Sequence, residues 1–222
     1  MDSMSSMAST RALLLAGVLL ANLGCASSSR AVARRPLPPP AGDGRAGTAN
    51  RGAGPALASA PPLKPDVKRA VDTAQSLVGQ REIVVGGHDY GSGCTALVRA
   101  AFDRAGHPLP ADARTAGELL GLAKERGVLK TGTRCAPGDV VFLADKPGGA
   151  PAHVGLVSRV DPDGTAVVVH RLARGVARMR VNLGYPGRAT DPSTGKRLND
   201  TLQVGKGTAP AGSLVVGVAT LL

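Results

Sequence analysis

Residues 26–64 form a segment that cannot fold, and it confines any packed domain to the chain that follows. The segment holds seven Pro, five Gly and three adjacent Ser, without apolar periodicity. A chain of this kind buries too little apolar surface to offset its ordering entropy. We interpret it, with Cys25 before it, as a disordered basic tether of residues 25–64. One domain is expected in residues 65–222, in keeping with about 150 residues per domain.

The start of the chain has the pattern of a secretion signal, which we place at residues 1–24. Its apolar run, 12–23, is too short to cross a bilayer of about 30 Å and suits a signal peptide. The sequence Leu23-Gly24-Cys25-Ala26 resembles the lipobox of bacterial lipoproteins, with Asn22 where that motif has Leu. The resemblance implies lipidation of Cys25 and a membrane-anchored lipoprotein of the cell envelope, facing the periplasm from the outer membrane where the cell has one. Secretion after cleavage is the alternative.

Composition excludes one class of partner that the charge would suggest. The net charge is +11, but aromatic residues make up only 2% of the chain and Trp is absent. Nucleic-acid readers that stack bases on aromatic rings are therefore not expected. Residues 26–64 carry +5 of the charge, either merely solvated or attracted to anionic surfaces. The scarcity of aromatics also predicts an aliphatic core.

Cys94 stands where a flexible turn runs into a predicted helix. Residues 86–93 are polar and turn-forming, whereas residues 94–106 carry apolar side chains at helical spacing and end at a glycine. In the first turn of a helix, free N–H groups and the macrodipole favour a thiolate, so we expect a pKa below about 8.5 for this thiol. The alternative is a structural disulfide between Cys94 and Cys135. Otherwise Cys135 is interpreted as a small buried residue.

Two predicted strands, 153–160 and 165–171, flank the turn sequence Asp161-Pro-Asp-Gly164 and form a hairpin. If residues 160 and 165 close the turn, His153 and His170 lie on one face as diagonal neighbours. A three-residue loop shifts the register by one and puts them on opposite faces, unless another bulge intervenes. Helices are predicted at 65–78 and 113–126, and Gly175 divides a basic stretch into two short strands.

These features follow one another as in a known family. The resemblance is to the NlpC-type peptidoglycan peptidases, and it rests on Gly86-Gly87, Cys94 on a helix, Pro137-Gly138-Asp139, His153-Val-Gly-Leu-Val, Val-Val-His170 and a last strand within 214–222. It covers about residues 66–222. It implies an α+β, papain-like fold in which N-terminal helices, the nucleophile helix among them, pack on a central antiparallel β-sheet.

The resemblance also implies a reaction and its residues. Cys94 would attack an amide bond of a peptidoglycan stem peptide, His153 would act as base and then as acid, and His170 would orient the His153 ring. No metal and no organic cofactor would take part. We expect a monomer that binds peptidoglycan and, through its lipid anchor, a membrane, but no nucleic acid.

The chain departs from the family pattern around the nucleophile. The family usually has Asp-Cys-Ser-Gly, whereas this chain has Gly93-Cys94-Thr-Ala, and Ile83 stands where the family has Tyr. These departures bear on which bond is cut, usually that between D-glutamate and the diamino acid, more than on the thiol chemistry. Candidate substrate-binding residues are Tyr90, Gly93 and His88. The CHAP-type amidases, with Cys followed by Thr, have a related fold, and a CHAP-type amidase is an alternative to the peptidase.

Two other functions on the same fold stay open. One is a catalytically inactive module that binds the envelope, and the other is a thiol acyltransferase that acts on lipid. The basic stretch near Gly175 has two interpretations as well: a solvated face, or a docking surface for the carboxylates of the glycan-peptide polymer. Its arginines are Arg171, Arg174, Arg178 and Arg180.

Overall fold

The structure is a computed structural model that describes residues 61–222. The predicted signal peptide, the lipidation site Cys25 and the tether up to residue 60 lie outside the described residues. The predicted division of the chain into these parts therefore stays a prediction, although the first helix does begin at Pro65.

The helices form where the sequence predicts them, with shorter bounds. They are α1 (Pro65–Ser76), α2 (Ala96–Ala105) and α3 (Ala116–Glu125). Pro65 and Asp66 occupy the first turn of α1, where a missing N–H costs nothing and a carboxylate faces the helix dipole. α3 begins with a capping box, in which the Thr115 hydroxyl and the Glu118 carboxylate satisfy each other's backbone N–H groups. None of the helices within residues 61–222 has the length and hydropathy of a membrane span.

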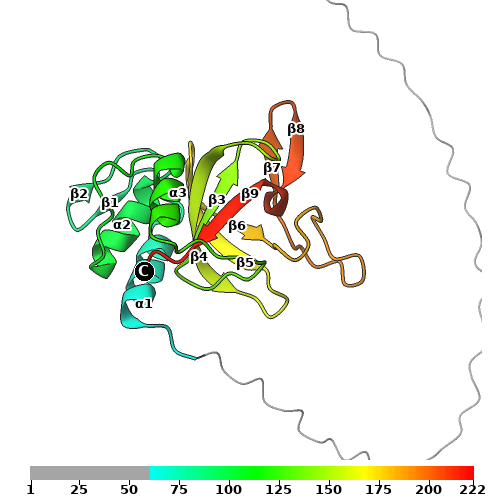
Figure 1. The fold of residues 1–222 in the computed structure, drawn as a ribbon, viewed down its shortest axis with the longest axis horizontal. Coiled ribbons are helices and arrows are strands. Elements are labelled where there is room, and N and C mark those ends of the chain that lie inside the picture. Colours follow the sequence, from blue (N-terminus) through cyan, green and yellow to red (C-terminus); the bar gives the residue numbers. More distant parts are fainter. Residues whose placement is uncertain (1–60) are drawn as a thin grey trace, which may run out of the picture. The chain divides into compact units, whose positions relative to one another are not determined.

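A five-stranded antiparallel sheet in the order β6-β5-β4-β3-β9 forms the centre of the fold. Its strands are β3 (Val140–Ala144), β4 (Pro151–Val160), β5 (Ala166–Leu172), β6 (Gly175–Val181) and β9 (Val215–Ala219). Figure 1 shows the helices gathered to one side of this sheet, where all three contact β4. The predicted α+β class, with helices packed on an antiparallel sheet, is confirmed.

Two small hairpins stand outside the main sheet. They are β1 (Val84–Val85) with β2 (His88–Asp89), and β7 (Thr201–Val204) with β8 (Gly207–Pro210), the latter followed by the 3-10 helix η1 (Ala211–Leu214). Neither hairpin is predicted by the sequence pattern. The strands are too short for an alternating pattern to stand out, and their side chains are largely exposed.

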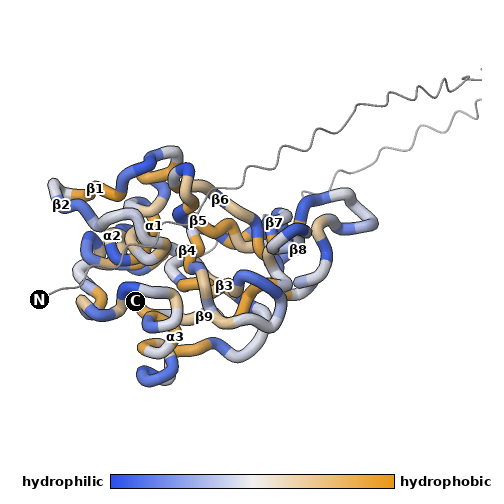
Figure 2. Tube along the Cα trace, turned by 90° about the horizontal axis from the view of Figure 1, so that it is seen from above, coloured by the Kyte–Doolittle hydropathy of each residue, from blue (hydrophilic) through white to orange (hydrophobic). Residues whose placement is uncertain are grey.

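The core is aliphatic, as the composition predicts, and has a layer on each face of the sheet. Figure 2 shows the apolar residues running along the central strands, while the peripheral loops are hydrophilic. On the helix side, Leu97 and Phe102 of α2 are fully buried in the same cluster as Phe142 of β3. On the other side, β3, β4 and β5 pack with Met179 and with Leu214 of η1. Both layers fix β4 and β5, which carry the two predicted active-site histidines.

The long connection between β6 and β7 is held by one buried amide. Asn199 is fully buried, and its Oδ1 accepts from the N–H groups of Asn182 (2.8 Å) and Gly212 (2.9 Å). Its Nδ2 donates to the carbonyls of Tyr185 (3.0 Å) and Arg188 (2.8 Å). The side chain thus forms hydrogen bonds with four backbone groups that are not paired within a helix or a strand.

We predict that Asn199→Ala destabilises the protein by about 3 kcal/mol, because it leaves several buried backbone groups without hydrogen-bond partners. Denaturant unfolding followed by circular dichroism measures this loss. Gln203→Ala is the control, since that exposed amide donates only to the Gly205 carbonyl at 2.9 Å. Equal stability of the two variants would contradict the structural role of Asn199.

Candidate functional site

Cys94 lies in the turn that leads into α2, not in its first helical turn. Thr95 is the N-cap residue and the helix begins at Ala96, so the prediction was wrong by two residues. The Ala96 N–H donates to the Gly93 carbonyl at 3.1 Å, which closes the turn around Cys94. The physical reason is the run Gly91-Ser92-Gly93, whose backbone is too free to continue the helix backwards. The thiol still faces the N-terminal end of α2.

The start of a second helix, α3, also lies beside the Cys94 thiol. This proximity is not predicted from the sequence. The Thr95 hydroxyl donates to the Arg114 carbonyl at 2.6 Å and draws the loop before α3 against Cys94. The N–H of Ala116, the first residue of α3, is consequently among the backbone amides that favour the Cys94 thiolate. The capping box at Thr115 was a readable sign of a helix start, but its position beside Cys94 follows only from packing.

Burial outweighs these amides in setting the ionisation of Cys94. Desolvation of the half-buried side chain raises the pKa of the thiol above its ordinary value. Four backbone N–H groups oppose this shift, those of Cys94, Val154, Thr95 and Ala116. The expected depression of the pKa by the helix dipole is therefore wrong in direction. Removal of the thiolate from water destabilises it by more than the backbone N–H groups stabilise it.

Two amides beside the thiol have no backbone partner within the described part of the chain. The N–H groups of Cys94 and Thr95 donate to no carbonyl there, and the Cys94 sulfur is the group on which they act. Free N–H groups next to a nucleophile are the donors that stabilise an oxyanion formed on attack at a carbonyl. The turn can therefore supply both the nucleophile and the donors for the negative charge that it generates.

The structure brings the two predicted histidines into contact. Nε2 of His153 and Nδ1 of His170 lie 2.9 Å apart, a hydrogen-bond distance. The rings are nearly perpendicular, with centroids 5.2 Å apart, and His170 is only 2% exposed. A hydrogen bond at Nε2 leaves Nδ1 of His153 as the nitrogen available for a proton from elsewhere.

The strand register that joins the histidines combines both predicted alternatives. Near the turn, Val160 pairs with Ala166 and Arg159 with Val167, which is the register of the three-residue loop. Ser158 then forms a bulge, and beyond it Val157 pairs with Val168 and Gly155 with His170. The bulge shifts the register by one residue and returns His153 and His170 to the same face. The Ser158 hydroxyl donates to the Val167 carbonyl at 3.0 Å and stabilises it.

Gly155 allows β5 to approach at the position of His170. A Cβ at residue 155 would overlap Cγ1 of Val168 and would lie 2.9 Å from the Val169 oxygen and 3.1 Å from Cβ of His170. The first two distances are shorter than real Cβ atoms show, and the third is tighter than most real contacts. The glycine two residues after His153 is therefore a requirement of the contact between the two imidazoles.

Cys94 approaches His153 through the flanking backbone. Its Sγ lies 3.9 Å from the carbonyl oxygen of Ala152, and the Val154 N–H is one of the amides that act on it. Within residues 61–222 no hydrogen bond joins Sγ to the His153 ring, and Nδ1 of that ring has no hydrogen-bond partner. Bonds between a nucleophile and its base are often long before substrate binds.

Both imidazoles are neutral at neutral pH. Burial lowers the pKa of His153, and burial together with the neighbouring His153 lowers the pKa of His170 to about 4. With a thiol whose pKa is raised, the resting site is a neutral thiol beside two neutral rings. It can act as a nucleophile with a general base, rather than as a preformed ion pair.

The order of these residues corresponds to a known domain. Residues 84–171 match the CHAP domain. The matching stretch, less than half of the chain, includes Cys94, His153 and His170, and it confirms the predicted resemblance to a CHAP-related family. No curated protein matches the sequence.

Solved structures of related proteins show limited similarity. The protein Ly7917 shares 16% identity at a TM-score of 0.43, over 69% of this chain and 62% of that one. An NlpC/P60 family protein from Bacillus cereus ATCC 10987 shares 16% identity at a TM-score of 0.41, over 71% of this chain and 40% of that one. A protein of Staphylococcus aureus subsp. aureus Mu50, similar to lipoprotein and of the NLP/P60 family, shares 16% at 0.35, over 70% and 44%. This chain thus spans less than two thirds of each.

The candidate substrate-binding residues of the CHAP stretch do not all lie at the thiol. Gly93 adjoins it, whereas His88 and Tyr90 stack edge to face with centroids 4.5 Å apart and line a separate pocket of about 170 Å³. The Tyr90 hydroxyl donates to the Asp103 carboxylate, and burial with this bond raises the pKa of Tyr90 to about 12. None of Cys94, His153 and His170 lines that pocket. A role in substrate binding stays a prediction for Gly93, His88 and Tyr90.

Cys94 and Cys135 are both free thiols, so the disulfide alternative is wrong. Cys135 is half-buried rather than buried as predicted, and desolvation with the nearby Asp139 raises its pKa to about 11. It packs in the apolar layer on the other face of the sheet, while Cys94 packs in the layer under the helices. The two cysteines therefore differ in environment.

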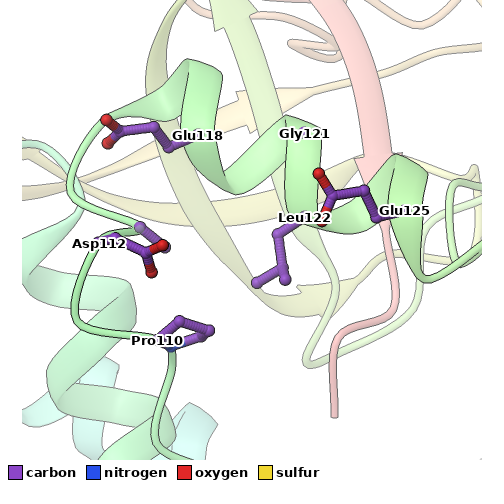
Figure 3. Close-up of a pocket in the computed structure, with 7 residues that line it drawn as sticks. Pro110, Asp112, Glu118, Gly121, Leu122 and Glu125 are labelled. Carbon is purple, nitrogen blue, oxygen red and sulfur yellow. The ribbon is translucent and has the colours of Figure 1, made fainter.

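An acidic pocket of about 310 Å³ lies along α3, and none of Cys94, His153 and His170 lines it. Figure 3 shows Asp112 and Glu118 on one side of it and Glu125 on the other, with Leu122 between them. Glu118 is already engaged with the N–H groups of Arg114 and Thr115. Across residues 61–222 no group of three His, Cys, Asp or Glu side chains is arranged to hold a metal ion.

We predict that Gly155→Ala costs about 1–3 kcal/mol of stability, because the new methyl group overpacks the β4–β5 pair. It should also separate His170 from His153, so the ring resonances of His170 should shift in a two-dimensional NMR spectrum. Gly187→Ala is the control, since a Cβ there has no neighbour within 4 Å. Unchanged stability and unchanged His170 resonances would contradict the role given to Gly155.

We predict that stability falls as the pH is lowered from 6.5 to about 4, the range between the ordinary and the lowered pKa of His170. In this range the unfolded chain binds a proton that buried His170 does not, so acid favours unfolding. Urea unfolding at several pH values measures the slope, and His170→Asn should reduce it. A slope unaffected by that substitution would show that His170 ionises normally in the folded protein.

Proposed function

We propose that this chain is a cell-wall hydrolase that cleaves an amide bond in the stem peptides of peptidoglycan by a Cys-His thiol mechanism. The observation that carries the proposal is the convergence of Cys94, His153 and His170 from one turn and two strands within a stretch that matches the CHAP domain. A thiol, a base and a group that orients the base are the parts that nucleophilic acyl transfer requires.

The reaction begins from the neutral thiol. Nδ1 of His153 takes the proton of Cys94 as sulfur attacks the carbonyl carbon, and the carbonyl oxygen becomes an oxyanion. The free N–H groups of Cys94 and Thr95 are positioned to donate to it. His153 then gives the proton to the leaving amine as the C–N bond breaks, which leaves a thioester on Cys94. Water, deprotonated by His153, releases the acid and restores the thiol.

His170 acts on the base and not on the substrate. With His153 Nε2–H donating to His170 Nδ1, the ring of His153 is held in the tautomer whose Nδ1 carries a lone pair. The opposite direction of this bond would protonate Nδ1 and block the reaction. His170 is therefore a positioning residue, and its burial keeps it neutral and able to accept.

Location in the cell is part of the same proposal. The secretion signal, the lipidated Cys25 and the tether would hold the domain at the envelope, within reach of the cell wall. Exported hydrolases of this kind need no targeting module if the anchor confines them to the surface of their substrate. A monomeric enzyme suffices for the reaction described.

We predict that Cys94→Ala lowers the release of fragments from purified peptidoglycan by at least about 10³-fold, since the nucleophile is lost. Mass spectrometry of the soluble fragments measures this and identifies the bond cut. Cys135→Ala is the matched control, because it removes the other free thiol. His170→Ala should lower kcat more than it changes KM, and His170→Asn, which keeps an acceptor, should restore part of the loss.

Other outcomes would support the other functions. If wild type and Cys94→Ala digest peptidoglycan equally poorly while both bind it, the chain is a binding module. A stable lipid adduct on Cys94 would indicate a thiol acyltransferase. Either result would overturn the hydrolase.

A further inference from the structure

A third pocket, of about 280 Å³, lies on the sheet at the ends of β4, β5 and β6. It is lined by Arg159, Val167, Arg178, Met179, Arg180 and Asp200. The register puts Arg159, Val167 and Arg180 in one row across the three strands, since Arg159 pairs with Val167 and Val167 with Arg180. Strands two apart are about 10 Å from each other, so the two arginines flank Val167 at this spacing. None of Cys94, His153 and His170 lines this pocket.

The pocket has more positive charge than the protein neutralises. Three arginines line it against the single carboxylate of Asp200. Asp200 is shared with Arg197 at 3.3 Å, and Arg159 has its own partner in Asp161 at 3.2 Å. Within the described part of the chain, neither Arg178 nor Arg180 has a carboxylate within ion-pair distance. Two planar guanidinium groups, two residues apart on β6, are thus available for an anionic ligand.

The edge of β6 adds an unused backbone pair at the same place. β6 is an edge strand, and Val176 bonds outward, donating to the Gln80 carbonyl at 2.8 Å and accepting from the Gly79 N–H at 2.9 Å. Arg180 also bonds outward, donating to the Asp200 carboxylate at 2.8 Å and accepting from the Asp200 N–H at 3.0 Å.

Arg178 lies midway between these residues, so its N–H and C=O also point outward. They have no partner within residues 61–222. The open position is one residue long, with chain segments closing the edge on both sides. It accepts a single residue of an extended chain rather than a whole strand.

We propose that this pocket binds an acidic peptide in extended conformation, with the N–H and C=O of one peptide residue paired to the Arg178 backbone and a carboxylate held by Arg178 and Arg180. An exposed N–H beside an exposed C=O matches a ligand that presents an acceptor and a donor on the same side, which a residue of an extended peptide does and a phosphate dianion does not. The guanidinium groups match a carboxylate with two parallel bonds. Resting on the proposed function, the occupant is a stem peptide of the cell wall, bound apart from the reacting one.

This site changes how the enzyme would meet its substrate. A polymer with many identical stem peptides can occupy the pocket with one stem and the thiol site with another. Attachment at two points raises the effective concentration of the second stem without any new contact at Cys94. Of the four arginines of the basic stretch, Arg178 and Arg180 then bind, whereas two lie outside the pocket. Arg174 is exposed on the β5–β6 turn, and Arg171 donates to the Leu172 carbonyl.

The test uses the full chain with Cys94→Ala, so that binding is measured without turnover. Binding to insoluble peptidoglycan is followed by co-sedimentation, and binding to a soluble stem tetrapeptide with free carboxylates by calorimetry. Adding Arg178→Ala with Arg180→Ala should weaken both roughly tenfold or more, the loss of a charge-assisted hydrogen bond or two. The control, Arg174→Ala with Arg126→Ala, removes the same charge from two exposed sites outside the pocket and should leave binding unchanged.

Three results would overturn the site. They are unchanged binding by the Arg178/Arg180 variant, an equal loss in the control, and displacement of the tetrapeptide by inorganic phosphate at the same concentration as by a second acidic peptide. Circular dichroism verifies that each variant is folded. Hydrolysis is measured separately on the chain with Cys94 intact, so failure of the enzyme leaves the binding result standing, and failure of binding leaves the hydrolysis result standing.

Discussion

The contact between β4 and β5 is the constraint on which the candidate site depends. Because Gly155 has no Cβ, β5 can approach β4 closely at the position of His170. The bulge at Ser158 then sets which residues of the two strands are paired. Without either feature the imidazoles would be apart or on opposite faces. Residues of β4 and β5 contribute to both layers of the core, so the two strands that carry the histidines are packed on both faces.

Around this pair, backbone N–H groups favour the charged form of the thiol, whereas burial disfavours it. The starts of α2 and α3 converge on Cys94 and supply N–H groups, while the protein removes the thiol and both rings from water. Burial prevails, and all three groups are held in their neutral forms. A neutral site is stable when empty, because no unpaired charge is buried, and its amides act when negative charge develops on a bound substrate.

The same sheet explains why a second site can exist beside the first. β4 and β5 carry the histidines toward one end, and the pocket at Arg178 and Arg180 lies where β6 leaves a backbone pair free. Segments at Gln80 and Asp200 close the rest of that edge, which protects it from pairing with other chains. An edge that is closed except at one residue is suited to a short extended ligand.

The sequence by itself determined the helices, the strand–turn–strand unit, the aliphatic core and the order of Cys94, His153 and His170, because helical spacing, turn residues and composition are local properties. It left the register of the hairpin open, since a bulge is chosen by the packing of both strands and not by the turn. It also mistook the direction of the Cys94 pKa, because the helix dipole is readable from local sequence whereas burial depends on what covers the side chain. The tertiary structure alone decided these points, along with the approach of α3 to the thiol and the free edge at Arg178, for each depends on residues distant in the chain that meet only when it folds.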